Sequence, residues 1–361
     1  MNNKPTLKTL TLAASTMAAL SLSPALEANP TLDWDQIGDQ TDTIGGQYIN
    51  GYVSNNTQGT ATTVTVTNNV TIQITNGCDT GYGNYRDILL LEQGTTFTVG
   101  TDLRIARKNS SSVSIYGTAS AVNVYIGKDD INASDGAMNV YSTGQLSVAG
   151  DFVVSGVRTT HMAPPPLGPY TVKDGKLQMQ GGVVTANAAK LGGVVGINNG
   201  GSISAGTVYA GSNAEVEIKS GGTITSTGDW FISSGATFAF ELNSGLLSTA
   251  AILGNGTLGT VLAPDYTTST AAPTGINLNL SVAVGTTFQP GDVLKLFDNM
   301  PFVSDAVSSP VISAGGYTFA VLTDGSGLSV QVIPEPGTYA LCGGVGAALL
   351  ALAARWRRRQ K

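Results

Sequence analysis

Clustered carboxylates are the residues of this chain that come nearest to a catalytic arrangement. Asp129, Asp130 and Asp135 lie within one short stretch, and Asp151 follows one repeat unit later. Two carboxylates held on neighbouring turns can serve as the acid and the base or nucleophile of glycoside hydrolysis. Adjacent aspartates are more often solvated turn residues. We therefore expect no catalytic residue in this stretch.

The other reactive side chains are few. The single histidine, His161, lies in a proline-rich insertion, which is a poor platform for a Ser-His-Asp relay. Cys342 lies in an apolar C-terminal stretch, so Cys78 has no disulfide partner in the body of the chain. No His/Cys cluster is available to bind a transition metal. The sequence predicts a protein without enzymatic activity, metal site or cofactor.

Positive charge is scarce in the body of the chain. Arg104, Arg107 and Lys108 form its only basic cluster, which could contact an acidic sugar but is more typical of a solvated strand edge. Residues 1–28 and 355–361 hold seven of the 18 basic residues and one of the 24 acidic residues, which leaves the rest of the chain a net charge of about −12. This acidic surface argues against binding to nucleic acid.

The elements that must position these residues repeat along the chain. Short runs of alternating apolar residues are separated by turns that contain glycine, as expected of half-buried strands. The glycines that anchor successive units are Gly94, Gly117, Gly144, Gly182, Gly201 and Gly222. One of the intervals between them is lengthened by the insertion at residues 161–170.

Units of about 20 residues with three short strands predict an all-β fold, a parallel β-helix or solenoid, because stacked units can bury apolar surface that no single unit can. We expect an N-terminal β cap at 29–93, solenoid repeats at 94–245 and a β-rich C-terminal cap at 246–333. An antiparallel sandwich or barrel also has regularly spaced short strands and is the alternative.

The N-terminal 28 residues have the pattern of a signal peptide. Lys4 and Lys8 precede an apolar stretch at 10–22 that is too short to span a bilayer, and small residues follow it. We expect cleavage after Ala25 or Ala28 and export of the body. An uncleaved N-terminal anchor is the alternative.

The C-terminal segment at 334–361 has three parts in a fixed order. Pro334, Glu335 and Pro336 form a stiff, extended peptide, and the uncharged stretch 337–354 follows. At about 1.5 Å per residue this stretch is just long enough for a single transmembrane helix. A basic stop completes the segment and predicts a cytoplasmic C-terminus; its arginines are Arg355, Arg357, Arg358 and Arg359. A plain membrane anchor and a buried core helix are the alternatives.

This order of Pro-Glu-Pro, apolar span and arginine-rich end resembles the PEP-CTERM sorting signal of bacterial surface proteins. The resemblance implies a membrane exosortase as processing partner, acting near Pro334–Pro336 in a Gram-negative bacterium that makes exopolysaccharide. It implies a precursor in the inner membrane, and a mature protein at the envelope surface or in the extracellular matrix.

The glycine-anchored units between residues 66 and 241 resemble the passenger repeats of autotransporters, which are right-handed β-helices. The long membrane barrel that ends an autotransporter has no room here, so self-secretion is not implied. We expect a non-enzymatic surface or matrix protein associated with extracellular polysaccharide. A polysaccharide lyase or glycoside hydrolase on a β-helix is the alternative.

Overall fold

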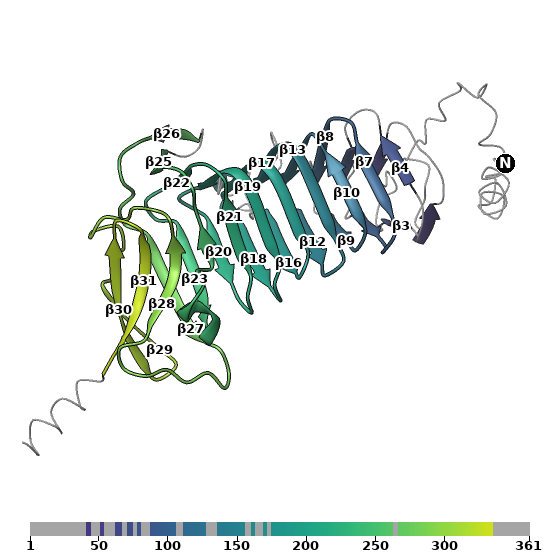
Figure 1. Cartoon of the computed structure of the whole chain (residues 1–361). Coiled ribbons are helices and arrows are strands. Elements are labelled where there is room, and N and C mark those ends of the chain that lie inside the picture. The colour runs from purple at the N-terminus through teal and green to yellow at the C-terminus, as the bar shows by residue number, and fades with distance from the viewer. Residues whose placement is uncertain are drawn as a thin grey trace, which may run out of the picture.

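The computed structural model of the protein describes residues 41–44, 51–53, 62–66, 71–74, 78–80, 87–105, 111–127, 136–155, 160–162, 169–171, 175–262 and 266–334. Within these ranges the regular structure is β-strand, apart from one short 3-10 helix, η2 (Ser244–Leu247). The strands form a long body of stacked coils, followed by an antiparallel sheet at the C-terminal end (Figure 1).

The first sheet of the body takes one strand from each coil. Its neighbouring strands are parallel, so its hydrogen bonds run from coil to coil along the body. Its ten strands, in spatial order, are β1 (Thr41–Ile44), β3 (Thr62–Val66), β6 (Asp87–Leu91), β9 (Ser111–Ile115), β12 (Gly136–Tyr141), β16 (Lys176–Gln180), β18 (Val194–Asn198), β20 (Glu215–Ile218), β23 (Thr237–Leu242) and β27 (Asn277–Val282).

The second sheet of the body takes two short strands from most coils, and these form two parallel rows. One row contains β4 (Thr71–Ile74), β7 (Thr96–Val99), β10 (Thr118–Ala121), β21 (Thr223–Ser226) and β24 (Ile252–Leu253). The other contains β2 (Gly51–Val53), β5 (Cys78–Thr80), β8 (Asp102–Ile105), β11 (Asn123–Ile126), β22 (Trp230–Ile232) and β25 (Leu258–Leu262). In three central coils one long strand joins both rows: β13 (Gln145–Val154), β17 (Val183–Leu191) and β19 (Ser202–Ala210).

The predicted anchor glycines lie in one column at the corner between the two sheets. In this column the amide of the residue after each glycine donates to the carbonyl one coil earlier; Ser202 donates to Gly182 and Thr223 to Gly201, for example. A Cβ on Gly222 would lie 2.5 Å from the carbonyl oxygen of Ile197. At this position of the corner a side chain would collide with the preceding coil. Gly94 is the exception, because Thr95 occupies this position in its coil.

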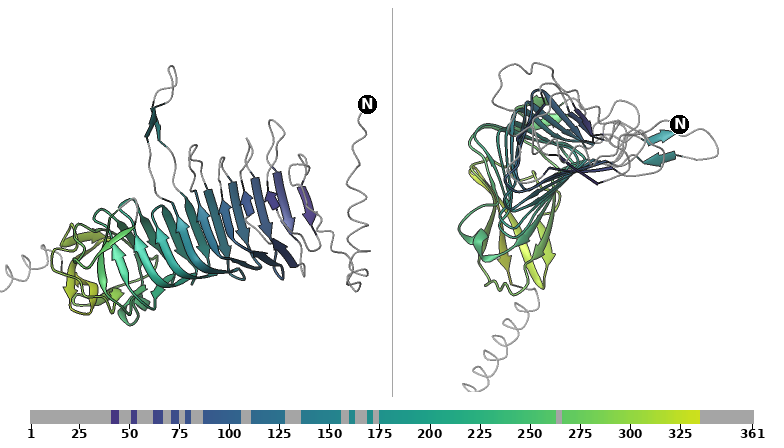
Figure 2. Two further views of the ribbon diagram at one scale, coloured as in Figure 1. Left: turned by 90° about the horizontal axis from the view of Figure 1, so that it is seen from above. Right: turned by 90° about the vertical axis from the view of Figure 1, so that its right-hand side faces the viewer.

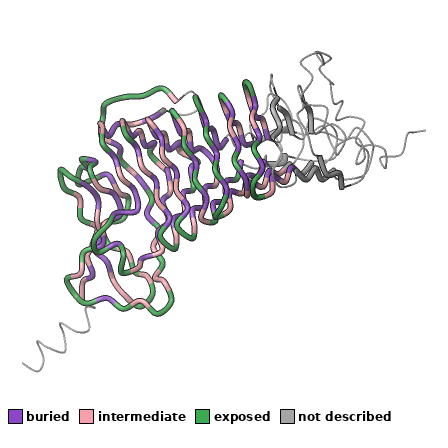
Figure 3. The backbone as a smooth tube through the Cα atoms, turned by 45° about the vertical axis from the view of Figure 1, so that its right-hand side comes forward, coloured by how far each residue is buried: buried purple, intermediate pink, exposed green. Residues whose placement is uncertain are grey.

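The core lies between the two sheets and is built from the inward-facing residue of every second strand position (Figure 3). One row of the first sheet shows the pattern, since its members are register partners in successive coils and are almost fully buried: Leu89, Val113, Met138, Leu177, Val195, Val216 and Phe238. The second sheet contributes Leu103, Val124, Phe152, Ala189, Val208 and Trp230 in the same way. Aromatic residues are concentrated toward the C-terminal coils.

The C-terminal sheet begins on the last coil. Strand β28 (Val293–Asp298) pairs in parallel with β24 and antiparallel with β31 (Gly327–Ile333). Strand β30 (Tyr317–Asp324) pairs with β31 and with β29 (Val311–Ala314). Phe297 on β28 is 5.2 Å from Phe238 and 5.6 Å from Phe240, measured between ring centroids, so the sheet is packed onto the first sheet of the body.

The expectation of an all-β fold with parallel, repeat-like coils is confirmed. Parallel pairing runs from β1 to β27, beyond the range 94–245 predicted for the repeats at both ends. Strands at the N-terminal end pair in register without a periodic glycine, which is why the sequence pattern assigned them to an N-terminal β cap at 29–93 and not to the repeats. Among the described residues no helix is long and apolar enough to cross a membrane. The predicted span 337–354 lies outside the described residues.

Candidate functional site

A strip of polar and aromatic side chains follows the second sheet across six successive coils. We call it the outer strip, and it consists of Asp102 and Arg104 (β8), Asn123 and Tyr125 (β11), Asp151 (β13), Lys190 (β17), Tyr209 (β19) and Phe231 (β22). These residues face outward because they alternate with buried neighbours such as Leu103, Val124 and Phe152. The strands that carry them lie side by side along the body (Figure 1).

The N-terminal part of the outer strip is a hydrogen-bonded chain. Arg104 Nη2 donates to Asp102 Oδ2 over 2.7 Å, and Asn123 Nδ2 donates to Asp102 Oδ1 over 2.9 Å. The backbone amide of Asp151 donates to Asn123 Oδ1 over 2.9 Å, and Lys190 Nζ donates to Asp151 Oδ2 over 2.5 Å. These hydrogen bonds therefore connect four coils. Two of the three links between coils join side chains, and the third joins the amide of Asp151 to the side chain of Asn123.

A bulge in β13 makes this chain possible. The register between β13 and β17 shifts between Val148 and Asp151. A Cβ on Gly150 would collide with Asn123 Oδ1, so glycine leaves the space that the Asn123 side chain occupies. The bulge turns the amide of Asp151 toward Asn123 and directs its carboxylate to Lys190.

The charges of the outer strip balance. Each of its two cations is ion-paired with a carboxylate, and all four side chains are partly exposed. Burial raises the pKa of Tyr125, the carboxylates of Asp102 and Asp151 raise it further, and Arg104 and Lys190 oppose this increase. Tyr125 is therefore held in its neutral form and can donate or accept a hydrogen bond, but is a poor general base at neutral pH.

The C-terminal part of the outer strip is aromatic. The rings of Tyr209 and Phe231 stack with centroids 5.3 Å apart, and Tyr266 meets Tyr209 edge-on at 6.0 Å. Lys190 Nζ lies 5.8 Å from the centroid of Tyr266. Tyr266 precedes β26 (Thr267–Ser269), which pairs antiparallel with β25, and burial raises the pKa of Tyr266 to about 12.

Tyr266 also has an uncommon backbone conformation. Its φ is 53°, in the left-handed region that bulky residues rarely adopt. Such a conformation persists where the surroundings determine it, and it is found more often at binding sites than elsewhere. The contacts with Tyr209 and Lys190 hold this side chain beside the outer strip.

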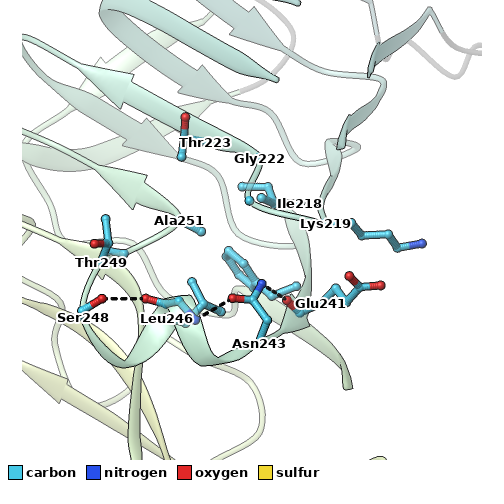
Figure 4. Close-up of a pocket in the computed structure, with 14 residues that line it drawn as sticks. Ile218, Lys219, Gly222, Thr223, Glu241, Asn243, Leu246, Ser248, Thr249 and Ala251 are labelled. Atoms are coloured by element: carbon cyan, nitrogen blue, oxygen red, sulfur yellow. Dashed lines mark hydrogen bonds between the residues drawn. The ribbon is translucent and has the colours of Figure 1, made fainter. Parts of the chain in front are cut away.

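A pocket of about 220 Å³ lies apart from the outer strip, at the corner formed by β20, β23 and η2 (Figure 4). Its polar groups serve the local fold: Asn243 Oδ1 accepts from the amide of Gly245, and Ser248 Oγ donates to the carbonyl of Gly245. Lys219 extends away from the pocket and pairs with Glu217. The pocket offers a small apolar space and no catalytic arrangement.

The structure brings together two residues that the sequence pattern had placed in separate clusters. Arg104 and Asp151 lie in the same outer strip, linked through Asp102 and Asn123. Asp102, Asn123 and Lys190 were not identified from the sequence. Aligning the segments Asp102–Ile105, Asn123–Ile126 and Asp151–Val154 as equivalent strands would have revealed the first two, since each segment begins with Asp or Asn and alternates with apolar residues.

Several predicted residues lie elsewhere. Arg107, Lys108, Asp129, Asp130 and Asp135 are outside the described residues. His161 is on β14 (Thr160–Met162), opposite Tyr170 on β15 (Pro169–Thr171), in a two-stranded hairpin that stands away from the coils (Figure 2).

Of the predicted sorting residues, Pro334 alone is among the residues that the structure describes. Pro334 follows β31 directly. Glu335, Pro336, Arg355, Arg357, Arg358 and Arg359 are outside the described residues. Within the ranges that the structure describes, no group of three or more His, Cys, Asp or Glu side chains is placed to hold a metal ion. Comparison of the chain with protein families, with curated proteins and with solved structures finds no match.

Proposed function

We propose that this chain is an exported, non-enzymatic surface or extracellular-matrix protein of a Gram-negative bacterium, associated with extracellular polysaccharide. The observation that carries the proposal is the outer strip, in which polar and aromatic groups follow one another over six coils while each cation is neutralised by a carboxylate. Such a surface of paired charges and aromatic rings suits the binding of a polymer that extends over several coils.

The proposal includes the route by which the protein reaches the surface. The signal peptide exports the body, the C-terminal helix holds the precursor in the inner membrane, and an exosortase-type enzyme processes it near Pro334–Pro336. Pro334 supports this order, because it directly follows β31, the last described strand of the C-terminal sheet. We also propose that the coils wind right-handedly, as parallel β crossovers nearly always do.

Fractionation of a bacterial host that has the exosortase-type enzyme tests this route. The mature protein should be found at the envelope surface or in the matrix and should lack Lys361 by mass spectrometry. Replacement of Pro334, Glu335 and Pro336 by alanine should leave the full-length form in the inner membrane. Exchange of the four arginines of the basic stop for glutamate should weaken this retention. An intact C-terminus on the surface protein would favour a plain anchor and exclude sorting.

The alternative is a polysaccharide lyase or glycoside hydrolase. One observation favours it: Asp102, Arg104, Asp151 and Lys190 are aligned on one strand face, as an enzyme acting on an extended sugar chain would require. Incubation of the protein with pectin, alginate and the host's own polysaccharide distinguishes the two functions. New reducing ends or unsaturated products, lost in Asp151→Asn, would establish the enzyme; binding without products supports the structural function.

A further inference from the structure

We propose that the outer strip binds a linear, uncharged polysaccharide chain that lies along the body, with about one sugar residue over each coil. This inference rests on the proposed association with polysaccharide, and it adds the binding site, the direction of the ligand and its charge class. It follows from the direction of the strip, its charge balance, its hydrogen-bonding groups and its aromatic end.

The direction of the ligand follows from the direction of the strip. The outer strip crosses β8, β11, β13, β17, β19 and β22 in sequence, so it runs parallel to the stacking direction of the coils (Figure 1). Neighbouring strands of a sheet are about 4.8 Å apart. This spacing is close to the advance of one sugar residue in an extended glycan, so successive sugars can meet equivalent positions of successive coils.

The charge class follows from the ion pairs. Asp102 with Arg104 and Asp151 with Lys190 give the polar part of the strip no net charge. The body around it is acidic, and an acidic protein repels a polyanion. A polysaccharide rich in uronic acid or sulfate would need unpaired cations, and the ammonium and guanidinium groups of the strip are already paired. An uncharged glycan is not repelled by the acidic surface and does not need unpaired cations.

The hydrogen-bonding groups suit sugar hydroxyls, which donate and accept at the same oxygen. Each carboxylate can accept about four hydrogen bonds. Asp102 accepts from Arg104 and Asn123, and Asp151 accepts from Lys190. Partly exposed ion pairs contribute little to stability, so folding alone gives little reason to line up four charged groups. Their mutual bonds instead fix their positions before a ligand arrives.

The aromatic end supplies apolar contact. Tyr209 and Phe231 extend the strip by two coils, and Tyr266 is held beside Tyr209 in a strained backbone conformation. The carbon faces of sugar rings are apolar, and tyrosine offers apolar area together with one hydroxyl. The strip thus ends in a group that can bind the last sugars of a bound segment.

Binding to defined glycans tests the inference. The exported protein is titrated with linear glucan, mannan, xylan and galactan oligosaccharides, from disaccharide to octasaccharide, with alginate as the charged comparison. We expect affinity for at least one uncharged series to rise with length and to level off near the hexasaccharide, and alginate to bind more weakly. No binding to any uncharged series, affinity independent of length, or tighter binding of alginate would each overturn the inference.

Substitutions locate the site. Asn123→Ala and Tyr209→Ala are each expected to lower affinity about tenfold. The matched control is Tyr116→Ala, because Tyr116 stacks on Tyr141 with centroids 4.0 Å apart on neighbouring coils but lies outside the outer strip. Circular dichroism verifies that each variant is folded. Equal loss in the control, or none in the two strip variants, would place the ligand elsewhere.

The two proposals fail in different ways. If the protein reaches the matrix and is processed at its C-terminus, but the strip variants bind glycan normally, the proposed function is supported and the inference is wrong. If the outer strip binds an uncharged glycan but the protein remains in the cytoplasm of its host, the inference is supported and the proposed function is wrong.

Discussion

The coiled body and the C-terminal sheet differ in the sequence separation of the strands that pair with each other. In the body, each strand pairs with its equivalents in the previous and next coil, so partners such as Val195 and Val216 are a whole coil apart in sequence. In the C-terminal sheet, β29, β30 and β31 pair with their neighbours along the chain. The body therefore depends on features shared by every coil, whereas the sheet depends on individual turns.

Each region shows this dependence in its turns. The body has a column of glycines at one corner, where a side chain would collide with the preceding coil. The hairpin between β30 and β31 is instead held by one side chain: Asp324 Oδ1 accepts from the amides of Ser326 and Gly327 and from the Ser326 hydroxyl, over 2.7–2.8 Å. A repeated backbone constraint and a single local network should respond differently to substitution.

The largest effect is expected from a charge inside a coil. Ile224 on β21 is fully buried, so Ile224→Asp places an unpaired carboxylate in the core and should cost more than about 4 kcal/mol of unfolding free energy. Chemical denaturation followed by circular dichroism measures it. The control is Thr225→Asp on the same strand, which faces outward and should cost little. Similar losses in the two variants would contradict the assigned faces of the coil.

A somewhat smaller effect is expected where the two regions meet. Phe297 is buried and contacts the rings of Phe238, Phe240 and Phe302, so Phe297→Ala should cost about 3–5 kcal/mol. We expect the C-terminal sheet to unfold before the coils in this variant, which would appear as two transitions in calorimetry. Val284→Ala, at a fully exposed position, is the control. A single transition at the wild-type temperature would show that the junction contributes little.

The glycine column should respond to a single methyl group. Gly222→Ala brings a Cβ against the carbonyl of Ile197 and should cost about 1–3 kcal/mol. The neighbouring Gly221 has φ of 78°, and a Cβ added to it would have no atom within 4 Å, so Gly221→Asn, which tolerates this conformation, should cost less. Thermal unfolding of both variants compares steric and conformational constraints at one corner. A larger loss of stability in Gly221→Asn than in Gly222→Ala would show that backbone conformation, and not steric contact, is the stronger constraint at this corner.

The smallest effect is expected at the C-terminal hairpin, and it depends on pH. Hydrogen bonds from the Ser326 hydroxyl and from the amides of Ser326 and Gly327 lower the pKa of Asp324 from its ordinary value. A carboxylate with a lowered pKa stabilises the fold at neutral pH, and this contribution is lost as the pH falls through the folded-state value. Asp324→Ala should therefore be slightly less stable than wild type at pH 7, and the difference should close in acid.

Asp305→Ala is the control for the hairpin, because it removes an exposed aspartate elsewhere in the C-terminal region. Denaturant titrations at several pH values make the comparison. A difference between Asp324→Ala and wild type that persists unchanged in acid would mean that the Asp324 hydrogen bonds do not determine the stability of the turn.

Much of the coiled architecture could be predicted, because each coil repeats the same local pattern. Gly117, Gly144, Gly182, Gly201 and Gly222 were identified from spacing alone and lie in one column. The N-terminal strands were less visible, since they pair by backbone hydrogen bonds and carry no glycine at regular intervals. The C-terminal sheet was predicted only as a β-rich cap at 246–333, although its strands alternate and Gly-Asp and Asp-Gly pairs mark turns at Gly291 and Asp324.

The outer strip could not be predicted as a unit. Arg104 and Asp151 were recognised as candidates, but their link through Asn123 depends on the bulge at Gly150, and Lys190 is distant in sequence. Arg104 and Lys190 are far apart in sequence. They lie on one face because the lengths of the intervening coils determine which positions become neighbours. Coil length varies with insertions, so pattern matching does not give that register.

The position of β31 suits this strand to bear a mechanical load. This strand lies between β28 and β30, with antiparallel partners on both sides, and the chain leaves it directly at Pro334. A force applied at Pro334 along the strand acts on both rows of hydrogen bonds at once, in shear, instead of opening them one by one from an edge. The C-terminal sheet is thereby suited to act as a tension-bearing clamp between the coils and whatever holds the end of the chain.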